Sequence, residues 1–227
     1  EFEPIPHLTC IGHRREEIYD ILVRYSELGI SNILALRGDP PKNRIGYDHS
    51  NDEFPHAIDL VKFIRAFQGH PDKRGFGIGV AGFPEGHPAT PNRLLEMEYL
   101  KAKVDAGADY ICTQLFFDNH DFFDFCERCE LAGISVPIIA GIMPVTSLST
   151  MRRMAELAGG SRFPAKLLRR IAAAGDDPFA VEKVGIEYAV EQCRELIENS
   201  VAGLHFYTLN QSSATREICR QLNLQFR

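Results

Sequence analysis

The chain has 227 residues, 44% of them hydrophobic, which is enough to fill the core of one large domain or two small ones. Its formal net charge is −6 and it has no run of basic residues, so neither nucleic acid nor an anionic membrane surface is an expected partner. No apolar run approaches the roughly 18 residues of a membrane span, and no signal peptide opens the sequence. The six cysteines are scattered, as is typical of reduced thiols. These features predict a soluble cytoplasmic globular protein.

Strand-like and helix-like segments alternate from end to end. In chain order the sequence predicts a strand over 5–10, a helix over 15–28, a strand over 33–36, a helix over 54–67, a strand over 76–81, a helix over 93–106, a strand over 110–114, a helix over 121–132, a strand over 137–140, helices over 147–158, 165–173 and 178–198, a strand over 204–207 and a helix over 214–222. Six β-then-α units with short apolar strands imply a parallel sheet in an α/β fold.

Three of these helices are predicted to stop in the same way, at a glycine that precedes the next strand: Gly29, Gly107 and Gly133. No linker or low-complexity segment divides the chain, so a single domain over residues 1–227 is the simpler prediction. A closed barrel of βα units needs eight of them in roughly 250 residues. Here there are six, so either the sheet is open or two units are missing.

The segment 33–36 is an uninterrupted apolar run, which is typical of a strand buried on both faces. It ends abruptly in Arg37, Gly38 and Asp39, and two prolines follow. The carboxyl ends of buried parallel strands are where α/β sheets bind ligands, and a glycine there lets a ligand ring approach the backbone. The alternative interpretation is an Arg-Asp pair that ends a strand in solvent.

Two motifs are not expected to carry chemistry. Gly77, Gly79 and Gly82 match the dinucleotide-binding fingerprint, but they lie inside a strand, and a Pro/Gly-rich loop follows in place of the helix that would hold a pyrophosphate. Cys126 and Cys129 form a CxxC in the middle of a helix, without a second pair at zinc spacing. The histidines are dispersed, so we expect no metal site.

Polar residues at or near strand ends remain, and on a parallel sheet they would line one rim. They include few strongly basic or nucleophilic groups, which suits a site whose bound cofactor carries the hard chemistry. These residues are His7, Arg37, Asp39, Glu85, His87, Gln114, Tyr207 and Asn210.

Six short motifs of the sequence resemble those of a known family. The motifs that carry the resemblance are PHLTC at 6–10, LRGDP at 36–40, FPEGHP at 83–88, TQLFF at 113–117, GIMP at 141–144 and GLHFYTLN at 203–210. In this order, and over the whole chain, they resemble methylenetetrahydrofolate reductase. The resemblance implies a (β/α)8 TIM-type barrel, of which about six units are present, with FAD at its carboxyl rim. It also implies a ping-pong oxidoreductase of one-carbon metabolism and methionine biosynthesis, in which NAD(P)H reduces the flavin and the flavin reduces methylenetetrahydrofolate. Relatives are commonly homo-oligomers.

The resemblance also implies roles for individual residues. Positions that look like flavin contacts are His7, Leu36, Arg37, Gly38, Asp39, His56, Ala57, Ala81, Phe83, His87, Glu96 and Lys103. Positions that look like folate contacts are Asp39, Gln114, Thr150 and Gln211. Asp39 is the candidate catalytic residue, between flavin and pterin.

Several of these positions differ from the family pattern. His56 and Phe83 stand where relatives carry Tyr, and Glu96 where they carry Asp. Thr150 and Gln211 stand where some relatives have Gln and Arg, which removes a possible partner for the folate glutamate carboxylate.

The family opens with two βα units that have no counterpart here, and the first of them carries the general-acid Glu. We therefore expect the sequence to be part of a longer chain. A second functional class stays open: a barrel that binds flavin or folate without reducing it, either as a subunit that needs a partner or as an inactive fragment.

Overall fold

The computed structural model describes residues 3–40, 46–157 and 161–224. It consists of two compact units. The first unit comprises Glu1–Gly82, Met97–Ile111 and Ala132–Pro137, and the second comprises Phe83–Glu96, Cys112–Leu131 and Ile138–Arg227.

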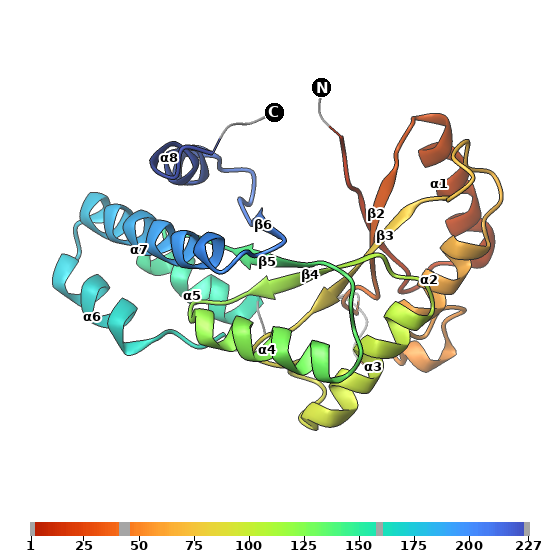
Figure 1. The fold of residues 1–227 in the computed structure, drawn as a ribbon, viewed down its shortest axis with the longest axis horizontal. Helices are drawn as coiled ribbons and strands as arrows, with labels where there is room; N and C mark the ends of the chain where they lie inside the picture. The colour runs from red at the N-terminus through yellow and green to blue at the C-terminus, as the bar shows by residue number, and fades with distance from the viewer. Residues whose placement is uncertain (1–2, 41–45, 158–160, 225–227) are drawn as a thin grey trace. The chain divides into compact units, whose positions relative to one another are not determined.

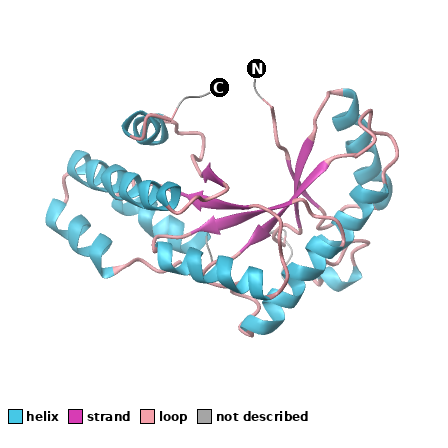
Figure 2. Cartoon of the chain, viewed as in Figure 1, coloured by secondary structure: helices cyan, strands magenta, loops and turns pink. Residues whose placement is uncertain are grey.

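Strands and helices alternate along the chain as predicted (Figures 1 and 2). The elements are β1 (His7–Thr9), α1 (Arg15–Glu27), β2 (Asn32–Leu36), the short 3-10 helix η1 (His49–Asn51), α2 (Ala57–Ala66), β3 (Gly77–Gly82), α3 (Arg93–Asp105), β4 (Tyr110–Leu115), α4 (Asn119–Leu131), β5 (Ile138–Ile142), α5 (Leu148–Leu157), α6 (Ala165–Ala174), α7 (Pro178–Glu198), β6 (Gly203–Phe206) and α8 (Ser213–Gln221). Among the elements of the described residues, only η1 was not predicted. The predicted end of the fifth helix, at residue 158, lies outside the described residues.

The six strands follow one another in the sheet in the order β1-β2-β3-β4-β5-β6. Strand β1 pairs with β2, β2 with β3, and β5 with β6, and each of these pairs is parallel. The predicted α/β class and parallel sheet are therefore confirmed.

Strand β2 is buried on both faces. Ile33 and Ala35 are completely buried, and the intervening Leu34 is 7% exposed. Since successive side chains of a strand point to opposite faces, an uninterrupted apolar run is needed when both faces are covered. This is why the sequence of this strand shows no alternation.

The glycine stops predicted after three helices are present. Gly29, Gly107 and Gly133 all have positive φ, at +73°, +113° and +72°. After the first of them the amide of Ile30 donates to the carbonyl of Tyr25, at 2.9 Å, which is the bond of a Schellman motif. Each of these helices thus ends at its glycine, and the next strand begins within a few residues.

The glycines of the apparent dinucleotide fingerprint lie inside β3, as predicted. A Cβ at Gly79 would overlap the ring of Tyr110, and one at Gly77 would overlap the side chain of Asn32. Close packing therefore explains two of these glycines.

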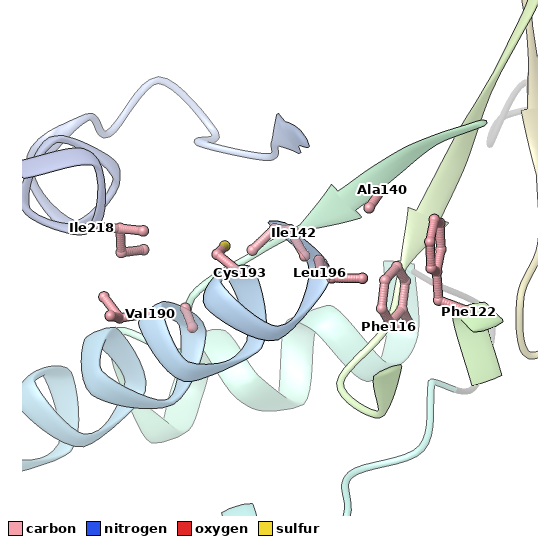
Figure 3. Packing of buried hydrophobic residues seen from close by; sticks show 9 residues of the cluster. Phe116, Phe122, Ala140, Ile142, Val190, Cys193, Leu196 and Ile218 are labelled. Carbon is pink, nitrogen blue, oxygen red and sulfur yellow. The ribbon is translucent and has the colours of Figure 1, made fainter. Parts of the chain in front are cut away.

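The main core of the second unit lies between α7 and strand β5 (Figure 3). Cys193 and Leu196 of α7 pack with Ile142 of β5, and all three are completely buried. Phe116 and Phe122 stack beside them, with ring centroids 5.2 Å apart. A second cluster includes Val181, near the start of α7, together with Met143, Met154 and Leu167.

The thiols of the CxxC lie in α4, as predicted, and all six cysteines are free. Burial raises the pKa of Cys126 to about 11 and that of Cys129 to about 12, so both are poor nucleophiles. Within 3–40, 46–157 and 161–224 no group of His, Cys, Asp and Glu side chains could hold a metal ion. In the same residues, no helix combines the length and apolar character needed to cross a membrane.

Helix α7 passes so close to the segment after β5 that Gly185 has no room for a side chain. A Cβ there would overlap the carbonyl oxygen of Val145, which is backbone and cannot move aside easily. We expect Gly185→Ala to lower stability by about 2 kcal/mol, because overpacking outweighs the roughly 1 kcal/mol gain in helix propensity. Thermal unfolding followed by circular dichroism measures the change. Gly203→Ala, whose Cβ would make only ordinary contacts with Ile139, is the control, and equal midpoints for the two variants would contradict the prediction.

Candidate functional site

Most of the predicted site residues of the first unit lie at or near the carboxyl ends of β1, β2 and β3. Thr9 pairs with Leu36, and Ala35 pairs with Val80. Beyond the strands, the amide of Ile11 still donates to the carbonyl of Arg37, at 2.9 Å. The Arg37-Gly38-Asp39 turn therefore begins at a defined point beside the end of β1.

Gly38 occupies a position that only glycine can take. Its φ is +89°, and a Cβ would lie 2.9 Å from both the Cβ of Thr9 and the Cγ2 of Ile11. The Nε of Arg37 donates to the carbonyl of Gly38 at 3.2 Å, which turns the guanidinium back over the loop. Arg37 is half-buried, whereas Asp39 is exposed. The turn thus presents one cation and one carboxylate beside bare backbone.

Cys10 joins this turn to the start of α2, through contacts with distant segments that no local sequence pattern predicts. Its fully buried Sγ lies 3.8 Å from the carbonyl oxygen of Arg37, 3.6 Å from that of Phe54 and 3.9 Å from that of His56. Ala57 is the first residue of α2, so the structure brings His56 and Ala57 toward Arg37.

Lys103 is also brought to this edge. Its ammonium donates to the carbonyl of Ala81, near the end of β3, at 2.9 Å. His7 is placed differently, because it is the first residue of β1 and pairs with Leu34 in the middle of β2. It therefore lies at the amino end of its strand and not at the carboxyl end.

The second unit contains a cavity of about 290 Å³ after β3 and β4. The loop between β3 and α3 forms most of its wall, and β4 and the segment before α6 complete it. The lining residues are Phe83, Pro84, Glu85, Gly86, His87, Pro88, Thr90, Pro91, Arg93, Gln114, Leu115 and Ser161. Four predicted rim or contact residues, Phe83, Glu85, His87 and Gln114, therefore share one cavity.

Phe83, His87 and Glu96 form one connected group. The rings of Phe83 and His87 meet edge to face, with centroids 4.6 Å apart. The carboxylate of Glu96 accepts from the amide of His87 at 3.0 Å and from Arg93 at 3.2 Å. Both of its oxygens are thus engaged by the protein itself, so Glu96 supports the position of His87.

The tautomer of His87 follows from its surroundings. Its Nδ1 accepts from the amide of Ala89 at 3.1 Å, so in the neutral ring the proton is on Nε2. The N–H of the neutral ring is therefore on the side away from Ala89.

The folate candidates of the second unit do not all line the cavity. Gln114 lines the cavity, and its Oε1 accepts from the amide of Leu115 at 2.9 Å. Thr150 is in the first turn of α5, where its hydroxyl lies 2.7 Å from that of Ser147. Gln211 is exposed in the turn after β6. Neither Thr150 nor Gln211 is among the residues that line the cavity.

The last two rim residues are also outside the cavity lining. Tyr207 donates from its hydroxyl to the carbonyl of Thr113 at 2.8 Å, and burial raises the pKa of this hydroxyl far above its usual range. Asn210 is exposed, with a φ of +62°. Tyr207 therefore links the residue directly after β6 to strand β4.

Glu85 is the unusual carboxyl of the cavity. Its Oε2 accepts from the amide of Arg162 at 2.8 Å, whereas its Oε1 is buried and has no hydrogen-bond partner. Burial raises the pKa of Glu85 above the ordinary 4.5, and the nearby charge of Asp121 adds to this shift. Arg162 and Ser161 carry no sequence signal that predicts this contact, because they lie far from Glu85 along the chain.

The pKa of Glu85 predicts a pH-dependent effect of Glu85→Gln on stability. A carboxyl whose pKa rises on folding destabilises the folded state as the pH rises through that pKa, and glutamine has no such cost. We expect the melting temperature of the variant, relative to wild type, to increase between about pH 4 and about pH 8. Glu127→Gln, which removes an exposed carboxyl of α4, is the control and should differ little from wild type. A difference that does not grow with pH would contradict the prediction.

Comparison with known proteins identifies the family. The methylenetetrahydrofolate reductase family model matches residues 1–223. Methylenetetrahydrofolate reductase 2 of Saccharomyces cerevisiae is 40% identical over 225 residues, which cover 98% of this chain and 37% of the yeast protein. Methylenetetrahydrofolate reductase (NADH) 1 of Arabidopsis thaliana is 39% identical over 231 residues, covering 98% of this chain and 38% of the plant protein. The chain therefore spans little more than a third of the length of these curated relatives.

A solved structure shares the fold. It is described as an uncharacterized protein from Clostridium thermocellum that binds two copies of 5-methyl-5,6,7,8-tetrahydrofolic acid. It is 13% identical to this chain, with a TM-score of 0.52 over 96% of this chain and 93% of the other. On the match over residues 1–223 and the identity with the curated relatives, the chain belongs to the methylenetetrahydrofolate reductase family.

Proposed function

We propose that this chain is the flavin-binding catalytic domain of a methylenetetrahydrofolate reductase, which reduces 5,10-methylenetetrahydrofolate to 5-methyltetrahydrofolate with NAD(P)H. The observation that carries the proposal is the Arg37-Gly38-Asp39 turn at the carboxyl end of a buried parallel strand, in a chain of this family. In the longer protein, residues 1–227 form most of a single (β/α)8 barrel domain. The sequential parallel strands support this proposal.

The residues at the strand ends of the first unit fit FAD. Ala35 and Val80 are completely buried, whereas the next residues along β2 and β3, Leu36 and Ala81, are only half-buried. Gly38 adds backbone without a side chain. Such accessible apolar and backbone surface suits a flat ring system, and it lies beside the polar groups of Arg37 and Asp39.

The proposed flavin contacts have distinct roles. Cations suit the pyrophosphate, and Arg37 and Lys103 can supply them, whereas the neutral ring of His87 can donate a hydrogen bond from Nε2. Phe83 offers an aromatic face, and Glu96 acts on the site through His87. The remaining proposed contacts are His7, Leu36, Gly38, Asp39, His56, Ala57 and Ala81. Bound FAD supplies the hydride chemistry of both half-reactions, in which NAD(P)H donates first and the folate is reduced second.

Asp39 and Gln114 are the proposed folate contacts with the best support. Asp39 is an exposed carboxylate at the end of β2, which can hydrogen-bond the pterin and stabilise positive charge near it. Gln114 lines the cavity of the second unit. Thr150 and Gln211 remain proposed contacts for the rest of the folate. Since Gln211 is uncharged, it forms no ion pair with the glutamate carboxylate of the substrate.

The proposed hydride donor is either NADH or NADPH. The relative from Arabidopsis thaliana is named for NADH, and a probable reductase of Caenorhabditis elegans, 38% identical over 220 residues, is named for NADPH. We further propose a cytoplasmic homo-oligomer that takes part in one-carbon metabolism and methionine biosynthesis, in keeping with its reduced, buried thiols.

A second candidate is a protein that binds a folate without reducing it. The observation that favours it is the shared fold with the Clostridium thermocellum protein, whose description mentions only the binding of two methyltetrahydrofolate molecules. Such a protein would serve as a carrier or as a subunit of a larger enzyme.

Purification of the complete natural protein tests the two candidates. A reductase is isolated with yellow flavin, oxidises NAD(P)H with menadione as acceptor, and converts methylenetetrahydrofolate to methyltetrahydrofolate. A folate-binding protein retains folate but lacks flavin and NAD(P)H oxidation. Absence of both flavin and reductase activity, even after FAD is added, would overturn the proposed function.

Asp39→Asn should separate the two half-reactions. The amide keeps the shape of the side chain but loses the charge that stabilises the iminium ion formed as the methylene bridge opens. We expect folate reduction to slow by about tenfold to about a thousandfold, and flavin reduction by NAD(P)H to slow less. Stopped-flow absorbance measures each half-reaction. Equal slowing of both would indicate a general disturbance of the flavin site and would remove this role from Asp39.

A further inference from the structure

Glu85 stands between two walls of the cavity in the second unit. Its own backbone belongs to the loop between β3 and α3, which also carries Phe83 and His87. Its carboxylate accepts from the amide of Arg162, in the segment that precedes α6. The neighbouring Ser161 lines the same cavity. A single side chain therefore joins the loop after β3 to the segment before α6.

The other attachments of Ser161 and Arg162 are weaker. The hydroxyl of Ser161 lies 3.5 Å from the carbonyl of Leu115, at the limit of a hydrogen bond. The guanidinium of Arg162 pairs with Asp121, but the arginine side chain is 65% exposed, and exposed ion pairs contribute little. The bond from the Arg162 amide to Glu85 is short, at 2.8 Å, and has a carboxylate as its acceptor, so it is the strongest of the three.

The same carboxyl group destabilises the folded state. Its Oε1 is buried without a partner, and an unsatisfied buried acceptor opposes folding. Asp118 and Asp121 face it with like charge, whereas Arg162 offers partial compensation. Arg93 and Arg128 donate to the backbone carbonyls of Glu85 and Pro84 and so hold the loop itself. A costly group at a cavity wall is more typical of a functional role than of a stabilising one.

We propose that Glu85 is a positioning residue, which joins the loop of Phe83 and His87 to Ser161 and Arg162 and thereby holds the cavity in the shape that binds the flavin. The inference rests on the proposed function for the identity of the ligand. It does not require Glu85 to touch that ligand. The role depends on an acceptor oxygen at this position and not on a negative charge.

Two substitutions test whether the role of Glu85 needs a hydrogen-bond acceptor or a negative charge. Glu85→Ala removes the acceptor of the Arg162 amide, whereas Glu85→Gln keeps one carbonyl oxygen for it. In the complete protein, stripped of flavin and titrated with FAD, we expect Glu85→Ala to bind FAD about tenfold more weakly than wild type, and Glu85→Gln to stay within about threefold. Asp121→Ala removes the exposed pair of Arg162 but leaves its amide bond, and should bind FAD within about twofold of wild type.

Hydrogen–deuterium exchange gives a readout that does not depend on flavin. Exchange at residues 83–91 and 161–164 should be faster in Glu85→Ala than in wild type, and close to wild type in Glu85→Gln. Circular dichroism and thermal unfolding of each variant verify that the fold is retained.

Three results would overturn the proposal: FAD affinity in Glu85→Ala equal to wild type, an equal loss of affinity in Glu85→Ala and Glu85→Gln, or unchanged exchange at residues 161–164 in Glu85→Ala. If wild-type protein binds no FAD, the proposed function fails instead. The exchange rates then decide by themselves whether Glu85 joins the two walls of the cavity.

Discussion

The parallel pairing of β2 with its two neighbours is the constraint on which the first unit depends. Because both faces of β2 are buried, its backbone groups can be satisfied only by β1 and β3. The register then brings the ends of the three strands to one edge. The left-handed turn at Gly38 follows at once, and the absence of a side chain there lets it pack against Thr9 and Ile11. The position of the Arg-Gly-Asp turn is therefore a consequence of backbone pairing.

The second unit combines a tight core with a less well satisfied cavity wall. In the core, α7 lies so close to the segment after β5 that Gly185 has no space for a methyl group. At the cavity, Glu85 leaves one buried oxygen without a partner. Strain of this kind persists only where the surrounding structure is rigid enough to hold it. Packing beneath the loops thus allows a cavity wall that keeps a buried oxygen without a hydrogen-bond partner.

Much of the candidate site could be predicted because its signals are local. Gly38 needs a positive φ directly after an apolar run, and Phe83, Glu85 and His87 share one short loop. The roles of other residues could not be predicted in this way. The carboxylate of Glu96, a proposed flavin contact, accepts from the amide of His87 and from Arg93. No local pattern indicates which backbone amides a carboxylate will meet.

The sequence by itself determined the order of strands and helices, the glycine stops between them, the doubly buried strand and the family, since each depends on neighbouring residues or on motifs. Only the tertiary structure decided the partners of side chains from distant segments. Glu85 and Arg162 are 77 residues apart, and Cys10 and His56 are 46 apart. Such contacts depend on which loops the folded sheet brings together, and this is set by the packing of the whole unit and not by any local stretch of chain.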